Sequence, residues 1–238
     1  MNRSNALNNL RDWGVVSFTF HYTHQLINRL IWFKVVRGMT LTNDTVNPPY
    51  QNGDPDGAAR LLSPNELAEV VVDGPRFGLD MAFVREAHVR GDSCIGCFDG
   101  KVLASYGWYS DKPDQLNADL RLIFDRDYVY MYRGYTAPGY RGRRLHAKCM
   151  AAALRHFTDL NYRGLISYVD GSNVPSLRST TKLGYQTFGT ILLVRLLGRY
   201  FIYHTRRCRD FGFRVQRHRK ETSVGSYSLD IGGNSSSK

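Results

Sequence analysis

The sequence predicts an α/β domain, and three observations in its second half support this prediction. A β-rich run, Tyr128–Tyr135, is followed by a Pro/Gly turn and by a basic segment at residues 141–146 that opens a helical pattern. A second apolar run at 165–169 leads through Asn173 into a short helix that ends at Lys182–Tyr185. Strand, helix, strand and helix in this order form a βαβα unit. Because a helix N-terminus carries unpaired N–H groups and a partial positive charge, the basic segment predicts an anion-binding site.

Length and composition narrow the class of protein. At 238 residues the chain suits one domain with additional segments, since single domains mostly stay below about 250 residues. Its 42% hydrophobic content is enough for a buried core, which excludes global disorder. The net charge of +11 favours an anionic partner: a nucleotide, a nucleic acid or an acidic membrane surface. Seven basic residues and one acidic residue lie between Arg206 and Lys220, so much of the excess is local, which weakens the case for nucleic-acid binding by the core.

We expect no membrane span, disulfide framework or metal site. The apolar stretch 15–36 is interrupted by residues such as Arg29 and Lys34, whereas a spanning helix needs about 20 mostly apolar residues. Four cysteines in a chain of this length do not suggest a disulfide framework. Cys94 and Cys97 lack two further ligands at a spacing that suits zinc, so we interpret them as core residues. A cytoplasmic location is expected, with peripheral contact at the inner membrane face as an option.

Composition and periodicity divide the chain into five expected segments. Apolar residues recur at helical spacing between Tyr22 and Phe33, and a first strand follows at Lys34–Leu41. We interpret this helix as packed on the domain, with a helix on a membrane surface as the alternative. The expected segments are 1–42 (helix and first strand), 43–62 (loop), 63–204 (core), 205–220 (basic segment) and 221–238 (disordered Ser/Gly-rich tail).

Two helices and a hairpin are expected at the start of the core. Ser63 and Glu66 form a capping box that begins a helix reaching about Val72. A second helix spans about Asp80–Val89. Strands at 93–98 and 102–108 then flank Asp99 and Gly100, which together are a type I′ hairpin signal.

Further strands and one long helix complete the expected core. The helix after the basic segment carries an apolar stripe that should face the sheet. That stripe consists of Leu145, Cys149, Ala152, Ala153 and Phe157. The additional strands are expected at 120–124, 186–197 and 200–204.

Two motifs precede the two helices of the βαβα unit. The first is Thr136-x-Pro138-x-Tyr140-Arg141-Gly142-Arg143, followed directly by a helix. The second is Asn173-x-Pro-Ser176, which leads to Lys182-Leu-Gly-Tyr185. In this order and spacing they resemble the GNAT superfamily of N-acetyltransferases. The resemblance covers about 63–204 in its order of elements.

The resemblance implies an α+β mixed sheet flanked by helices, with central strands Tyr128–Thr136 and Leu165–Val169 that splay apart. Acetyl-CoA, the expected co-substrate, would lie in that gap. Main-chain groups around Tyr135 and Thr136 would pair with the pantetheine arm as an added strand does. The other implied contacts are the pyrophosphate on Arg141, Gly142, Arg143, Arg144, Leu145 and His146, and the cofactor arm on Asn173 and Ser176.

The sequence departs from the family pattern at three positions. Arg144 and His146 stand where the family has small residues, and glycine there lets the backbone approach the phosphates closely. We expect the two side chains to supply compensating charged contacts, with crowding of the loop as the alternative. Thr180 stands where the family often has a tyrosine that acts as general acid toward the leaving thiolate. Because a threonine hydroxyl is a poorer acid, Tyr185 or a water is a further candidate.

Asp170, at the end of the predicted strand 165–169, is the best-placed carboxylate for a general base. His146 and Asp127 are the next candidates. The competing interpretation of Asp170 is a turn or capping residue ahead of Asn173.

The tyrosine-rich strand has two different faces. Tyr128, Tyr130 and Tyr132 are expected on one face, opposite Val129, Met131 and Arg133. The tyrosine stripe suits a core or an acceptor pocket, because a tyrosine presents an apolar body and a polar tip. The arginine on the other face would then need a partner in the middle of the sheet.

The sequence therefore favours an enzyme: an acetyl-CoA-dependent N-acyltransferase in which a primary amine attacks the thioester directly in a ternary complex. A non-catalytic module of the same fold that binds acyl-CoA or another anion is the first alternative. A basic protein associated with a membrane or a nucleic acid, through Arg206–Lys220, is the second. A solvated tail or terminal helix is the other interpretation of that basic segment.

Overall fold

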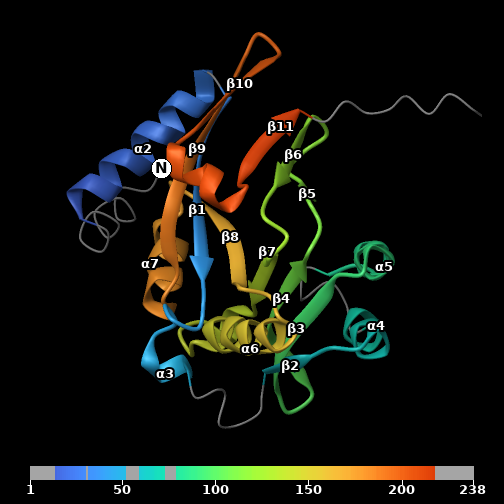
Figure 1. Cartoon of the computed structure of the whole chain (residues 1–238). Coiled ribbons are helices and arrows are strands. Elements are labelled where there is room, and N and C mark those ends of the chain that lie inside the picture. Colours follow the sequence, from blue (N-terminus) through green and yellow to red (C-terminus); the bar gives the residue numbers. More distant parts are fainter. Residues whose placement is uncertain (1–13, 31, 52–58, 73–78, 218–238) are drawn as a thin grey trace, which may run out of the picture.

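A computed structural model describes residues 14–30, 32–51, 59–72 and 79–217. A large mixed sheet forms its centre, with helices on its sides and a smaller sheet beside it (Figure 1). From edge to edge the large sheet contains β10 (Arg199–His204), β9 (Gln186–Leu196), β1 (Trp32–Leu41), β8 (Gly164–Asp170), β7 (Tyr128–Thr136), β4 (Val102–Ser110), β3 (Ser93–Asp99) and β2 (Ala59–Leu61). The small sheet contains β11 (Arg214–Arg217), β6 (Leu120–Ile123) and β5 (Asp114–Gln115).

Helices connect and cover these strands. The α-helices are α2 (Val15–Leu30), α3 (Pro48–Gln51), α4 (Pro64–Val72), α5 (Met81–Arg90), α6 (Leu145–Asp159) and α7 (Val174–Leu183). Two 3₁₀ helices are η2 (Pro138–Tyr140) and η3 (Arg206–Phe211). The expected capping box starts α4, since the Glu66 amide donates to Ser63 Oγ (3.3 Å) and the Ser63 amide donates to Glu66 Oε2 (2.9 Å).

The central strands splay apart as the family resemblance predicts. β7 and β8 are the parallel pair of the large sheet, and they pair only where Tyr128–Tyr130 faces Gly164–Ile166. The remaining residues of both strands are not paired with each other. β8 is held on its other side by β1, from Val36 opposite Asp170 to Leu41 opposite Leu165. The divergence therefore leaves one edge of each strand open.

A bulge in β7 interrupts the expected alternation of its side chains between the two faces of the sheet. Trp108 of β4 pairs with Arg133 and Tyr109 pairs with Met131, so Tyr132 is an extra residue on β7. As a result Tyr132 and Arg133 both contact Phe83 of α5, with a ring–ring distance of 6.3 Å and a guanidinium–ring distance of 4.2 Å. The prediction that Arg133 lies opposite the tyrosine stripe was therefore wrong.

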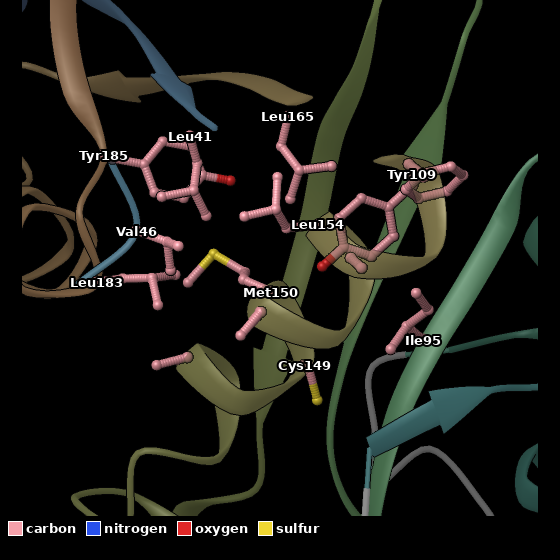
Figure 2. Packing of buried hydrophobic residues seen from close by; sticks show 14 of the residues in the cluster. Leu41, Val46, Ile95, Tyr109, Cys149, Met150, Leu154, Leu165, Leu183 and Tyr185 are labelled. Atoms are coloured by element: carbon pink, nitrogen blue, oxygen red, sulfur yellow. The ribbon is translucent and has the colours of Figure 1, made fainter. Parts of the chain in front are cut away.

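Buried side chains form three clusters on the two faces of the large sheet. Figure 2 shows the cluster beneath α6, where Met150 and Leu154 pack against residues such as Leu41 and Leu165. Cys149, Ala153 and Phe157 of the predicted stripe are buried there. The second cluster contains residues of the small sheet, and the third contains residues of α4 and α5. Cys97 belongs to the first cluster and Cys94 to the third, as expected for core residues three apart on a strand.

Several expected boundaries differ from the structure at the N-terminal end. The first helix ends at Leu30, and Phe33 lies in β1. The expected loop 43–62 contains α3 and β2, and residues 52–58 of that loop lie outside the described residues. In the hairpin, Asp99 pairs with Val102, so the turn is Gly100–Lys101. Only Gly100 of the two has a positive φ, which excludes type I′.

The C-terminal half also differs from two expectations. The strand expected at 120–124 ends at Ile123 and belongs to the small sheet, which the sequence did not predict. The basic segment is folded through residue 217, because η3 buries Cys208 and β11 pairs with β6. A solvated tail or a terminal α-helix was therefore the wrong interpretation of this part. Residues 218–220 and the tail 221–238 lie outside the described residues.

Candidate active site

The gap between β7 and β8 contains a cavity of about 330 Å³, which we call the inner cavity. Its walls come from β1, β7, β8, α6 and α7. The lining residues are Met39, Tyr130, Met131, Tyr132, Gly134, His146, Met150, Ser167, Tyr168, Val169, Asp170, Asn173, Ser176, Thr180 and Tyr185. Six of the predicted site residues thus meet at one cavity: His146, Asp170, Asn173, Ser176, Thr180 and Tyr185.

A second cavity of about 1070 Å³, the outer cavity, lies between the N-terminus of α6, α3 and α7. Its lining residues are Asn47, Pro48, Pro49, Tyr50, Thr136, Tyr140, Arg141, Gly142, Arg144, Leu145, His146, Ala147, Pro175, Ser176, Arg178, Ser179, Thr180 and Lys182. None of these residues is acidic. His146, Ser176 and Thr180 line both cavities, so the two adjoin.

The main chain of β7 offers polar groups along its open edge. Ser105 Oγ donates to the Tyr135 carbonyl (2.9 Å), and the Ala137 amide donates to the Ala104 carbonyl (2.9 Å), so the main chain at 135 and 137 faces β4. The main-chain N–H and C=O groups of successive residues in a strand point to opposite sides. Those of Gly134 and Thr136 therefore point toward β8. The structure therefore offers Gly134, rather than the predicted Tyr135, beside Thr136.

The N-terminus of α6 is uncapped and faces the outer cavity. Arg144 is its N-cap residue, without a side-chain capping bond, and the first turn contains no acidic residue. Arg144 has φ 61°, the left-handed region that glycine favours. The backbone at this family glycine position therefore keeps the conformation of a glycine even though the residue is arginine. The amides at the start of α6 are left without side-chain partners, as an anion site requires.

Four basic side chains line the outer cavity. They are Arg141, Arg144, Arg178 and Lys182. Arg141 Nε also donates to the Thr136 carbonyl (3.4 Å), which holds the side chain against the open end of β7. Arg143 is directed elsewhere: its Nη1 lies 3.8 Å from Asp99 Oδ2, its guanidinium lies over the Tyr140 ring, and it lines neither cavity.

His146 stands where the two cavities meet. Its Nδ1 is buried and has no hydrogen-bond partner. Burial lowers the pKa of this imidazole to about 4, so the ring is neutral at pH 7. A Cβ added at Gly134 would collide with the ring, so the glycine of β7 makes room for it. The compensating charge that we expected from His146 is therefore absent at neutral pH, and only Arg144 adds charge.

The polar residues of α7 are partly engaged in the helix itself. Asn173 Oδ1 accepts from the Ser176 amide (3.2 Å) and caps α7. Thr180 Oγ1 donates within the helix to the carbonyls of Ser176 (3.0 Å) and Leu177 (3.1 Å). A hydroxyl bound in this way has no proton ready for a leaving group.

Tyr185 lines the inner cavity from the core. The residue is 3% exposed, and burial raises the pKa of its phenol, which therefore stays protonated. Figure 2 shows its hydroxyl directed among the buried side chains of the cluster beneath α6, and the hydroxyl has no hydrogen-bond partner. The phenol is thus an uncommitted donor in an apolar setting.

Asp170 lines the inner cavity from the end of β8 and also shapes a turn. Its Oδ1 accepts from the Ser172 amide (2.9 Å) and from Ser172 Oγ (2.6 Å). The interpretation of Asp170 as a turn residue is therefore confirmed. Because the residue also lines the inner cavity, its role as a general base stays a prediction. Asp127, the other carboxylate considered, lines neither cavity.

Sequence reasoning offered Tyr130 and Tyr132 for a core or an acceptor pocket, but it missed Tyr168 of the same aromatic wall and part of the basic wall. Tyr130 stacks with Tyr132 and with Tyr168, each at 6.3 Å between ring centroids. Tyr168 is separated from the others by the whole of α6, and only the pairing of β7 with β8 brings it near. Lys182 belongs to the motif that ends at Tyr185, but the motif does not indicate that the last turn of α7 brings this side chain to the outer cavity.

The described residues show neither a metal centre nor a span. No group of three or more His, Cys, Asp or Glu side chains is arranged there to hold a metal ion. No helix in the described part of the chain is long and apolar enough to cross a membrane.

Comparison with known proteins identifies the family. Residues 58–185, more than half of the chain, match the sequence profile described as the Acetyltransferase (GNAT) family. The chain therefore belongs to the GNAT acetyltransferase family. A search of curated proteins gave no match.

Solved structures of this fold are similar at low sequence identity. A GNAT-family protein from Novosphingobium aromaticivorans has 13% identity and a TM-score of 0.45, covering 67% of this chain and 62% of its own. An acetyltransferase from the GNAT family of Colwellia psychrerythraea has 13% identity and a TM-score of 0.48, with 72% and 57% covered. The structure of yncA from Salmonella typhimurium with its cofactor acetyl-CoA has 14% identity and a TM-score of 0.39, with 71% and 97% covered. The chain thus spans about three fifths of the first two structures, and similarities at this level concern the fold alone.

Proposed function

We propose that this protein transfers an acetyl group from acetyl-CoA to a primary amine by direct attack in a ternary complex. One observation carries the proposal: an acid-free, arginine-lined cavity at an uncapped helix N-terminus adjoins a cavity between two splayed strands. The first suits a pyrophosphate, and the second suits a thioester and an acceptor. Family membership supports the same assignment.

The outer cavity would hold the phosphates. The amides of Leu145 and His146 lie in the first turn of α6, where the helix dipole favours negative charge. Arg141 and Arg144 add full charges beside them, and Gly142, with φ 81°, lets the loop turn. These groups fit a diphosphate in both charge and hydrogen-bonding capacity.

The open edge of β7 would guide the pantetheine arm inward. The main chain of Gly134 and Thr136 faces the gap, so an amide-containing arm can pair there as an added strand. Asn173 and Ser176 lie across from this edge at the start of α7. The thioester would then reach the inner cavity, where the aromatic wall and Asp170 surround an acceptor.

The reaction has two proton transfers to arrange. The amine nitrogen attacks the thioester carbonyl carbon, the C–N bond forms, the C–S bond breaks, and the thiolate leaves. Asp170 is our candidate for the base that removes the proton from nitrogen. Tyr185 is the better candidate for the donor toward the thiolate, because its hydroxyl is uncommitted whereas Thr180 donates to its own helix.

Calorimetry with acetyl-CoA tests the assignment of the outer cavity. Arg141→Ala should weaken binding by about 1–3 kcal/mol, the range for a charge-assisted hydrogen bond. Arg143→Ala is the matched control, since it removes a neighbouring arginine that lines neither cavity, and it should leave affinity within about twofold. Equal affinity for wild type and Arg141→Ala would remove the phosphate assignment.

The second candidate function is a non-catalytic module that binds acyl-CoA. The observation that favours it is the threonine at position 180, whose hydroxyl is bound within α7. A free-thiol assay with pooled primary amines separates the two functions. Release of CoA that depends on an amine supports the enzyme, whereas tight binding without release on every amine supports the module.

A further inference from the structure

The hairpin of β9 and β10 projects beyond the rest of the molecule (Figure 1) and exposes apolar side chains at its tip. Leu197 is 94% exposed and Leu196 is 45% exposed. Leu196 pairs with Arg199, so Leu197 and Gly198 form a two-residue turn. Neither leucine belongs to a buried cluster of the described residues. Packing among the described residues therefore does not account for them.

Leu197 also has an unfavourable backbone conformation. Its φ is 50° and that of Gly198 is 75°, so both turn residues are left-handed, as in a type I′ turn. The first position of that turn favours Asn, Asp or Gly, because a larger side chain is strained there. The chain thus keeps a leucine where an asparagine would suit both the backbone and the solvent. Such an outlier is a reason to look for function at the site.

Aromatic side chains lie just behind the tip. Trp32 packs edge-on against Tyr200 at 5.7 Å between ring centroids, and the Arg195 guanidinium lies over the Tyr200 ring at 5.5 Å. Phe201 is 57% exposed. Arg199 pairs with Leu196 and Tyr200 pairs with Arg195, so cations and aromatic rings flank the apolar tip together, the residue types found where proteins enter a membrane interface.

The charge around the tip is positive. Arg195, Arg199 and Arg217 are exposed, and Arg217 Nη2 donates to the Tyr200 carbonyl (2.6 Å), which fixes the end of β11 beside the hairpin. Asp119 is the acidic group in contact with this region, through the Tyr200 hydroxyl at 3.4 Å. Three cations around two leucines complement an anionic lipid surface.

We propose that the β9–β10 hairpin docks onto an anionic membrane, with Leu196 and Leu197 inserted at the acyl-chain boundary and the arginines at the headgroups. A protein partner suits this tip less well, because a stable interface needs about 800 Å² from each side and a two-leucine turn offers far less. Insertion of a small apolar tip together with several arginines is sufficient for reversible membrane binding.

Docking would also set the position of the inner cavity. Val36 pairs with both Asp170 and Ile191, so Asp170 lies level with a residue six positions before Leu197 on β9. At about 3.3 Å per residue, the end of β8 is then about 20 Å from the tip along the strand. The docked protein holds the inner cavity near the membrane plane, where a membrane-associated amine can reach it.

Co-sedimentation of the full chain with lipid vesicles tests the proposal. The vesicles contain phosphatidylcholine alone or equal parts of phosphatidylcholine and phosphatidylglycerol, and binding to the anionic vesicles is expected. Leu197→Asn should weaken that binding by about tenfold or more, because it removes a fully inserted side chain. Its melting temperature should stay equal or rise, since asparagine suits the left-handed position. Val89→Asn, which removes an 87% exposed valine from α5, should bind as wild type does.

Arg199→Gln gives a second, electrostatic measurement. It should weaken binding to the anionic vesicles by about fivefold and leave binding to phosphatidylcholine unchanged. The proposal is overturned if the wild type does not bind anionic vesicles, or if Leu197→Asn binds them as tightly as Val89→Asn. A dimer in analytical ultracentrifugation that Leu197→Asn abolishes, without vesicle binding, would assign the tip to a second copy of the chain instead.

Discussion

The outer and inner cavities share three residues but offer a ligand different chemistry. The outer cavity presents helix amides and cations such as Arg141, groups that attract any phosphate through charge. The inner cavity is lined by aromatic rings and uncharged polar side chains, among them the neutral imidazole of His146, and Asp170 is the carboxylate of its lining. If the proposed function is right, affinity for the donor and turnover should therefore respond to different substitutions.

The largest expected effect belongs to the inner cavity. Asp170→Asn removes a charge but keeps the Oδ1 acceptor that holds Ser172, so the turn should persist. We expect kcat to fall by about 10²–10⁴-fold, the usual contribution of a general base, while the affinity for acetyl-CoA is unchanged. Steady-state kinetics with calorimetry measure both quantities. Full kcat in this variant would show that Asp170 serves the turn alone and that the base lies elsewhere.

A smaller effect is expected at His146, one of the three residues that line both cavities. The pKa of His146 is about 4 in the folded chain and about 6.5 unfolded, so between these pH values the unfolded chain binds more protons. Its contribution to stability is therefore present above about pH 6.5 and is lost as the pH falls toward 4, by about 3 kcal/mol in all. Urea unfolding at pH 7 and pH 5 should show this loss in the wild type.

His146→Gln is the comparison for that experiment, because glutamine does not titrate. Its free energy of unfolding should fall less between pH 7 and pH 5 than that of the wild type. Equal losses of unfolding free energy in the two proteins would mean that burial does not hold the imidazole neutral. The contrast between a positively charged outer cavity and an uncharged His146 where the cavities meet would then be wrong.

The smallest effect concerns the loop of the outer cavity. Arg144→Gly and Arg144→Ala both remove the cation, but only glycine suits a φ of 61°. The glycine variant should be more stable than the alanine variant by about 1 kcal/mol. Both should lose the same acetyl-CoA affinity, as calorimetry can check. Equal stability in thermal unfolding would contradict the left-handed conformation described here.

The sequence predicted the outer cavity better than the inner one, for a physical reason. The helix start at Leu145 and the arginines before it are adjacent in sequence, so local rules locate them. The inner cavity depends on contacts between distant strands, and the bulge at Tyr132 cannot be read from an alternating pattern. Tyr168 and Met39 enter the cavity only because β8 lies beside β7 and β1 lies beside β8, which local periodicity does not report.

The sequence predicted most helices and strands, but it predicted less well which strands lie beside one another. The splayed pair followed from the family resemblance, and most elements from α4 to β10 followed from motifs and periodicity. The small sheet was missed, because β5 has only two residues and β11 pairs with β6, which lies far earlier in the chain. Arg143 shows the limit at single residues: it stands in the motif beside Arg141, yet it faces Asp99.

The place of β1 has a consequence for how the chain is made. This strand is synthesised early, but both of its neighbours, β8 and β9, come from the last third of the chain. Such distant pairings are slow to form. During translation β1 must therefore wait with two unpaired edges, a state that invites aggregation. A fragment trimmed to the family profile, residues 58–185, would lack this strand together with β9 and β10, so β8 would become an unpaired edge of the sheet.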